Sequence, residues 1–194
     1  RFDGDPIPPI LALEAARKGG DLEACRTIYC GSFSKTLSPG LRVGWVCAAM
    51  PVISQLVLMK QAADLHSATL NQIAISSVAE QHFESHIDTI RSAYRARRDA
   101  MLAALEAHMP KGVSWTKPEG GMFIWVTLPD TLDGAELLKQ SLESERVAFV
   151  PGHAFFADGS GRNTLRLSYS TSTEDKIAEG IERLGQLISR ALNA

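Results

Sequence analysis

The 194-residue chain has few cysteines, no long apolar run and no marked excess of one charge. Cys25, Cys30 and Cys47 lack the spacing of metal ligands, and an odd number cannot pair completely. No apolar stretch approaches the ~20 residues that span a bilayer, and no secretory leader is visible. Twenty basic and 22 acidic residues leave a net charge of −2 without a charged tail. We therefore expect reduced thiols in the cytoplasm, and no metal, membrane or nucleic-acid partner.

What is present is an ordinary globular composition, with 45% hydrophobic and 22% charged residues. This length can bury a core in one or two domains. The chain begins at Arg1 rather than at Met, and the prolines Pro6, Pro8 and Pro9 follow closely. Such a start is typical of a loop that follows folded structure. We expect the chain to be part of a longer protein.

The pattern of apolar residues changes near Ser85, where we expect one long helix to begin and to run to about His108. Before it we expect strands at 27–30, which should be buried, and at 42–48, and helices beginning at Pro51 and Asn71. After it we expect strands at 122–128, 146–150 and 164–168, a helix at 134–143 and a final helix capped by Thr173. The fold class is therefore α/β, with a domain boundary between residues 85 and 86.

Four arginines lie on the expected long helix: Arg91, Arg95, Arg97 and Arg98. A basic cluster on a helix can bind nucleic acid, but an ordinary solvated face is the commoner case. We expect the solvated face.

The stretch Gly31-Ser32-Phe33-Ser34-Lys35, with Arg42 seven residues later, carries the clearest chemistry. A lysine amine can form an imine with an aldehyde, and burial behind an apolar strand would favour its reactive neutral form. Serine hydroxyls and a guanidinium can hold a phosphate. The local alternative is a surface Ser/Lys loop followed by a Pro-Gly turn.

Further motifs follow in order along the chain. They are Lys60-Gln-Ala-Ala-Asp-Leu-His66, Asn71-Gln72, Pro118-Glu-Gly-Gly-Met-Phe-Ile-Trp125, Phe149-Val-Pro-Gly152 and Asn163-Thr-Leu-Arg166-Leu-Ser168. Together with the stretch from Gly31 to Gly44, this series resembles the class I/II pyridoxal-phosphate aminotransferases of fold type I. The resemblance is closest to the 2-aminoadipate/kynurenine aminotransferase branch, and it covers essentially the whole chain.

The resemblance implies a role for each motif residue. Lys35 would bond the aldehyde of pyridoxal 5′-phosphate and later move the substrate proton, while Ser32, Ser34 and Arg42 would bind the cofactor phosphate. Arg166 would bind the substrate α-carboxylate, and the alternative for it is an ion-paired strand arginine.

Four other residues could serve the site, but we expect them not to. Phe123 and Trp125 are expected in the core rather than against substrate. His66 and His153 could act as acid–base groups, yet the lysine itself can move the proton.

The resemblance also implies a domain layout and an activity. Residues 1–85 would end the large cofactor-binding domain, and residues 86–194 would form the small domain. The intact protein would be a homodimer that transfers an amino group from an L-amino acid to a 2-oxo acid such as 2-oxoglutarate, whereas this chain alone would be inactive. One alternative is the aminotransferase-like sensor domain of a winged-helix transcription regulator. The other is a different fold type I enzyme, namely a decarboxylase, synthase or lyase.

Overall fold

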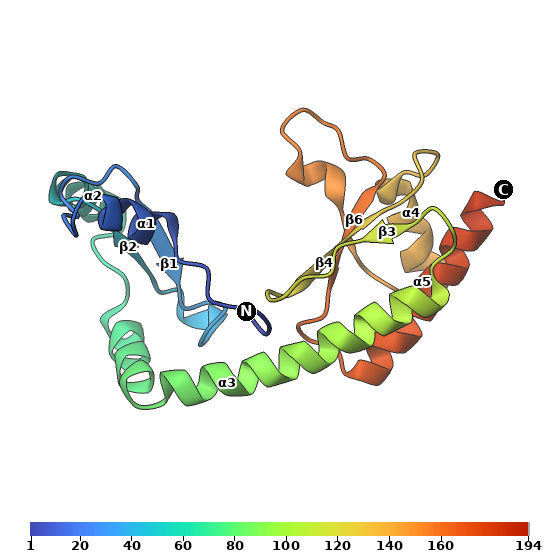
Figure 1. Cartoon of the computed structure of the whole chain (residues 1–194), viewed down its shortest axis with the longest axis horizontal. Helices are drawn as coiled ribbons and strands as arrows, with labels where there is room; N and C mark the ends of the chain where they lie inside the picture. Colours follow the sequence, from blue (N-terminus) through green and yellow to red (C-terminus); the bar gives the residue numbers. More distant parts are fainter. Residues whose placement is uncertain (194) are drawn as a thin grey trace. The chain divides into compact units, whose positions relative to one another are not determined.

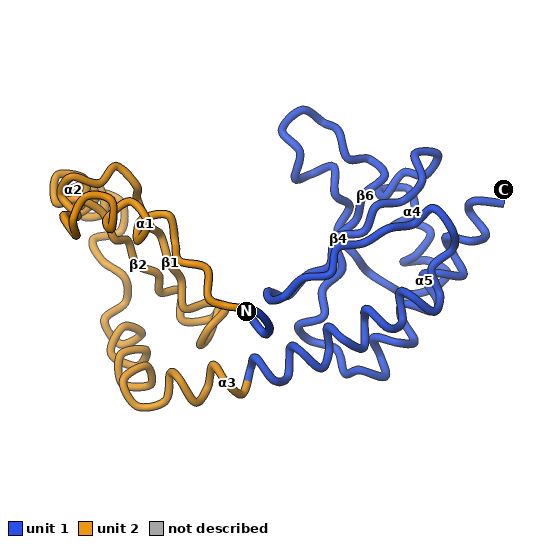
Figure 2. Tube along the Cα trace, viewed as in Figure 1, with its two compact units in different colours: residues 1–4, 90–194 blue, residues 5–89 orange. Residues whose placement is uncertain are grey.

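The computed structural model describes residues 1–193 and divides into two compact units (Figures 1 and 2). Unit 2 is Asp5–Thr89, and unit 1 combines Arg1–Gly4 with the chain from Ile90 onward. The division falls inside one helix, between Thr89 and Ile90. The assignment of residues 1–85 and 86–194 to a large and a small domain stays a prediction.

Unit 2 is built around a two-stranded antiparallel sheet that pairs Tyr29 with Cys47 and Ser32 with Gly44. Its elements are α1 (Ile10–Arg17), β1 (Tyr29–Ser32), the 3₁₀ helix η1 (Pro39–Leu41), β2 (Gly44–Cys47), α2 (Met50–Ala63) and the first part of α3 (Thr69–His108). Gly31 is required in β1, because a Cβ there would lie 2.2 Å from the ring of Trp45.

The expected burial of the first strand is wrong for the part of the chain described. Ile28 and Tyr29 are 50% and 38% exposed, and α2 contributes no buried side chain among residues 1–193. The physical reason is that a two-stranded sheet cannot bury its side chains without further strands or a helix packed over it. The apolar sequence of α2 and β1 therefore lies at the surface of unit 2.

Helix α3 replaces the two helices expected from residues 71 and 85. The stretch Thr69–His108 contains neither Gly nor Pro, so nothing in it ends a helix. Asn71 is not a cap, since it lies inside α3 and its Nδ2 donates to the carbonyl of Leu41 at 3.0 Å. The change of pattern at residue 85 marks a change of surroundings rather than a helix start.

The expected solvated arginine face on α3 is found for Arg91 and Arg95, which are exposed, but the expectation is wrong for Arg98. Arg98 is only 8% exposed, and its Nη1 donates to Asp3 Oδ2 at 2.6 Å and to the Pro118 carbonyl at 2.9 Å. Arg97 Nη1 donates to the Ser170 carbonyl at 2.6 Å. The hydrogen bond from Arg98 lowers the pKa of Asp3. Residues 1–4 thus bind to α3 through Asp3. The pattern of residues within the helix could not predict this contact.

Unit 1 contains a four-stranded antiparallel sheet in the order β3-β4-β6-β5. The strands are β3 (Ser114–Trp115), β4 (Phe123–Thr127), β5 (Val150–Pro151) and β6 (Thr164–Ser168). The other elements are α4 (Gly134–Gln140), the π-helical turn η2 (Ser141–Glu145), the 3₁₀ helix η3 (Gly152–Phe155) and α5 (Glu174–Leu192). The strand expected at 146–150 is thus reduced to a two-residue pairing, because η2 continues the chain helically after α4.

One face of this sheet forms the core. Ile124 and Val126 of β4 alternate with Trp125, and Leu165 and Leu167 of β6 meet the same core. Helix α5 covers it with the expected stripe of Ile177, Ile181, Leu184 and Ile188, all of which are buried. Thr173 stands at the expected N-cap position, but its side chain makes no capping bond.

All three cysteines are free thiols: Cys25 is buried, Cys47 is half-buried and Cys30 is exposed. Among residues 1–193, no helix combines the length and the apolarity needed to cross a membrane.

Candidate functional site

The two predicted phosphate-binding serines meet at the end of β1. Ser32 Oγ accepts from the backbone N–H of Ser34 at 3.1 Å and donates to Ser34 Oγ at 2.9 Å. The N–H of Phe33 donates to the carbonyl of Val43 at 3.1 Å, which ties this turn to the segment just before β2. Two hydroxyls are therefore held next to the chain that follows Arg42.

Lys35 lies on the tight turn between β1 and η1. The carbonyl of Phe33 accepts from the N–H groups of Thr36, Leu37 and Ser38, at 3.3, 2.8 and 3.1 Å, so the turn is well defined. Lys35 is exposed, and the expectation that it is buried is wrong for this chain, because β1 itself is uncovered. Within the described residues no carboxylate pairs with its amine, which leaves the amine available to a ligand.

Arg42 adopts a left-handed backbone conformation, with φ of 54°, directly after η1. This conformation costs a non-glycine residue roughly 1 kcal/mol. The Arg42 Nη1 atom donates to the carbonyl of Pro39 at 3.2 Å, and Asn71 holds the preceding carbonyl of Leu41 from α3. Asn71 is thus a positioning residue for this loop. Asn71 belongs to one of the sequence motifs, but the sequence alone predicts only that it caps a helix.

Arg166 lies in β6, opposite Trp125 of β4 and Val150 of β5. Its guanidinium carbon lies 4.0 Å from the centre of the Phe123 ring and 4.7 Å from that of Phe155. Its buried Nε has no hydrogen-bond partner, and no carboxylate among residues 1–193 forms an ion pair with it. The alternative of an ion-paired strand arginine therefore does not describe this structure.

The expected core position of Phe123 and Trp125 is wrong. Strand alternation puts them on the sheet face opposite the core, together with Arg166, and Phe123 is 37% exposed. The period-2 pattern of residues 122–128 shows that one face differs from the other. It does not identify which face carries function.

The candidate residues thus form two groups. Ser32, Ser34, Lys35 and Arg42 share the β1–β2 connection in unit 2, and Arg166 belongs to unit 1. His66 lies between α2 and α3 and contacts the carbonyl of Ser67 through Nδ1, at 2.8 Å. His153 lies exposed in η3.

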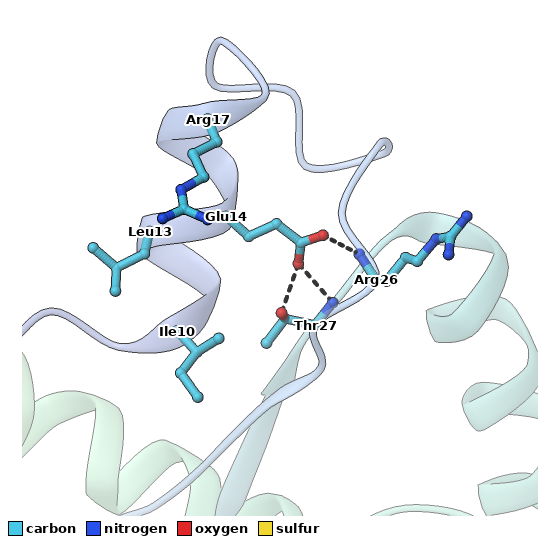
Figure 3. A pocket seen from close by; sticks show the side chains of 6 residues that line it. All are labelled: Ile10, Leu13, Glu14, Arg17, Arg26 and Thr27. Carbon is cyan, nitrogen blue, oxygen red and sulfur yellow. Dashed lines mark hydrogen bonds between the residues drawn. The ribbon is translucent and has the colours of Figure 1, made fainter.

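The carboxylate of Glu14 lines a pocket beside α1 and accepts hydrogen bonds from two neighbouring residues (Figure 3). Glu14 accepts from Thr27 Oγ1 at 2.6 Å and from the N–H groups of Thr27 and Arg26 at 2.9 and 3.0 Å. The Thr27 hydroxyl, followed by these two N–H groups, lowers the pKa of Glu14 from 4.5 to about 2. The side chain ties α1 to the segment that leads into β1.

Protection of the Arg26 and Thr27 amides in the intact protein should fall as the pH drops from about 4.5 towards about 2. A carboxylate whose pKa is lowered by folding contributes stability that is present above its ordinary pKa and is lost as the pH falls through the folded value. Hydrogen exchange of residues 22–30, corrected for the intrinsic exchange rate, measures the loss. Glu14→Gln should lower protection at neutral pH and flatten the profile, whereas Glu84→Gln on α3 serves as the control. An unchanged profile in Glu14→Gln would contradict this role.

Comparison with known proteins identifies relatives over nearly the whole chain. The 2-aminoadipate transaminase of Thermus thermophilus is 48% identical over 182 residues, which are 94% of this chain and 44% of that protein. The aromatic-amino-acid aminotransferase 1 of Thermococcus litoralis is 45% identical over 193 residues, which are 99% of this chain and 44% of that protein. The chain therefore spans less than half the length of these relatives.

A solved structure gives the same result for the fold. The α-aminoadipate aminotransferase of Thermus thermophilus, complexed with N-(5′-phosphopyridoxyl)-L-leucine, matches with a TM-score of 0.90 and 44% identity. The match covers 99% of this chain and 48% of that one, which confirms the expected α/β fold and part of the fold type I architecture. The family model for aminotransferase class I and II matches residues 8–184. The chain belongs to the class I and II aminotransferase family.

Proposed function

We propose that this chain carries the cofactor lysine and the substrate-carboxylate arginine of a pyridoxal-phosphate-dependent aminotransferase. The observation that carries the proposal is the donor set of the β1–β2 connection. There two hydroxyls 2.9 Å apart, a guanidinium and an amine share one short loop, and no carboxylate of residues 1–193 pairs with that amine. The names of the similar proteins support the same activity.

This donor set fits pyridoxal 5′-phosphate. Ser32, Ser34 and Arg42 would hold the phosphate, since hydroxyls and a permanent cation suit a dianion. The amine of Lys35 would bond the aldehyde carbon. When bound, the cofactor supplies a carbonyl that condenses with amines and a ring that accepts the electrons left behind when the substrate loses its Cα proton.

The remaining steps belong to the protein's own side chains. The guanidinium of Arg166 binds the α-carboxylate of the amino acid through its planar fork and so fixes the orientation of Cα. The Nζ of Lys35, once released from the aldehyde, takes the proton from Cα. The same groups then serve the 2-oxo acid that runs the reaction in reverse.

We infer further that the intact protein is a cytoplasmic homodimer. Its amino donor is 2-aminoadipate or a broader set of L-amino acids, and its acceptor is a 2-oxo acid such as 2-oxoglutarate. The names of two relatives, a 2-aminoadipate transaminase and an aromatic-amino-acid aminotransferase, support an acidic or aromatic donor.

Adding L-amino acids one at a time to the intact, cofactor-loaded protein tests this function. We expect 2-aminoadipate or an aromatic amino acid to convert the bound cofactor to its aminated form, with release of the matching 2-oxo acid. Cadaverine, an amine without an α-carboxylate, should leave the cofactor spectrum unchanged. Tight cofactor binding with no response to any amino acid would favour the regulator, and release of carbon dioxide would favour a decarboxylase.

A further inference from the structure

Two phenylalanines reach the guanidinium of Arg166 from opposite neighbours of its strand. In the sheet, β6 lies between β4 and β5. Phe123 comes from β4, and Phe155 comes from η3, which follows β5 directly. Their ring centres lie 4.0 and 4.7 Å from the guanidinium carbon. Side chains from segments on both sides of β6 thus contact the guanidinium of Arg166.

These rings are not core residues. Phe155 is 51% exposed, and Phe123 also lies on the sheet face opposite the buried one. Leaving large aromatic rings partly open to solvent loses burial energy that the core would have gained. Their contact with Arg166 gives them another use, because an aromatic face attracts a guanidinium and limits its rotation.

A third aromatic side chain supports this arrangement. The ring of Trp125 meets that of Phe155 edge to face at 5.6 Å. A Cβ on Gly152 would lie 2.8 Å from Trp125 Cζ2, so the start of η3 packs closely on the same indole. Trp125 therefore holds the segment that presents Phe155.

Among residues 1–193, the structure shows no protein acceptor for the guanidinium of Arg166. Aromatic rings attract a guanidinium without accepting conventional hydrogen bonds from its N–H groups, so those groups stay available to a ligand. The Nε–H is one of these groups, and it is buried without a partner in the described chain. An unpaired buried donor is unfavourable unless a ligand supplies the acceptor.

We propose that Phe123 and Phe155 are positioning residues, which orient the guanidinium of Arg166 so that it binds a carboxylate in a bidentate manner. The inference rests on the proposed function, because it takes the ligand to be an amino or oxo acid. Its particular consequence is that both phenylalanines affect every carboxylate ligand equally, whatever side chain that ligand carries.

The test uses Phe155→Leu, Phe155→Tyr and Phe123→Leu in the intact, cofactor-loaded protein. Calorimetric binding of propionate and glutarate, neither of which can react, should weaken by roughly 3- to 30-fold in the two leucine variants. Phe155→Tyr keeps an aromatic face and should restore binding to within about twofold. The matched control is Phe156→Leu. Phe156 is the next residue and also contacts Trp125, with a ring distance of 6.0 Å, but it does not stack on Arg166 in the described chain.

Kinetics provide the second readout. Phe155→Leu should raise KM for alanine, phenylalanine and 2-aminoadipate by the same factor, with a smaller change in kcat and unchanged cofactor affinity. A loss restricted to one amino acid would mean that Phe155 contacts the substrate side chain and would overturn the inference. An equal loss of carboxylate binding in Phe156→Leu would show that the effect comes from general packing, and it would overturn the inference as well.

Failure of this inference can be told apart from failure of the proposed function. If amino acids react normally in Phe155→Leu, the positioning role is wrong and the aminotransferase stands. If carboxylate binding depends on Phe155 but no amino acid reacts, the positioning role of Phe155 is correct and the proposed reaction is wrong.

Discussion

Lys35→Ala should lower the transamination rate of the intact protein by roughly 10⁴-fold or more, because one amine both bonds the cofactor and moves the Cα proton. The steady-state rate with the best amino acid measures the loss. The visible absorption band of the lysine-linked cofactor should also vanish. Borohydride reduction followed by mass spectrometry should then find no cofactor attached to the chain.

Two further variants separate chemistry from charge. Lys35→Arg keeps the positive charge, but a guanidinium neither bonds the aldehyde nor gives up its proton, so it should be as inactive as Lys35→Ala. Lys18→Ala removes an exposed lysine at the end of α1 and should retain full activity. Covalent cofactor persisting in Lys35→Ala would assign the bond to another lysine.

Arg166→Ala should weaken amino-acid binding by roughly 100- to 1000-fold, since it removes two charge-assisted hydrogen bonds to the α-carboxylate. Its effect on cofactor affinity should remain within a few-fold, roughly the range of an indirect contact. Arg166→Lys should recover little, because an ammonium keeps the charge without the planar fork. KM values for several amino acids, together with equilibrium dialysis of the cofactor, measure the two effects.

Arg42→Ala should have the opposite effect to Arg166→Ala and weaken cofactor binding far more than amino-acid binding. Arg162→Ala is the control in unit 1, where Arg162 is exposed and pairs with Asp133 at 2.8 Å. If Arg166→Ala releases the cofactor and Arg42→Ala leaves it bound, the two roles have been assigned to the wrong arginines.

Several elements could be predicted because their signals are local. The stripe of α5 repeats at helical spacing, and β4 alternates between buried and more exposed residues, so the sequence predicts both close to where they occur. The order of short motifs likewise identified the family, since each motif is read from a few adjacent residues. These signals need no knowledge of distant parts of the chain.

Other features could not be predicted because they depend on contacts between distant residues. Arg98 is buried and donates to Asp3, which lies 95 residues away in sequence, so the helix pattern alone predicts a solvated arginine there. The apolar run that leads into β1 predicts a buried Lys35, whereas β1 is largely exposed among the described residues. An apolar pattern shows which side chains a strand can bury, but the elements that pack over them come from distant parts of the sequence.

The sequence by itself determined the family and the α/β class, because residue type and motif order are written along the chain. It also predicts the site residues Ser32, Ser34, Lys35, Arg42 and Arg166, whose roles stay a proposal. Only the tertiary structure decided how these groups are held. The register of β4 against β6 put Trp125 beside Arg166, and the path from β5 into η3 brought in Phe155. Strand pairing sets such neighbours, and no window of adjacent residues contains them.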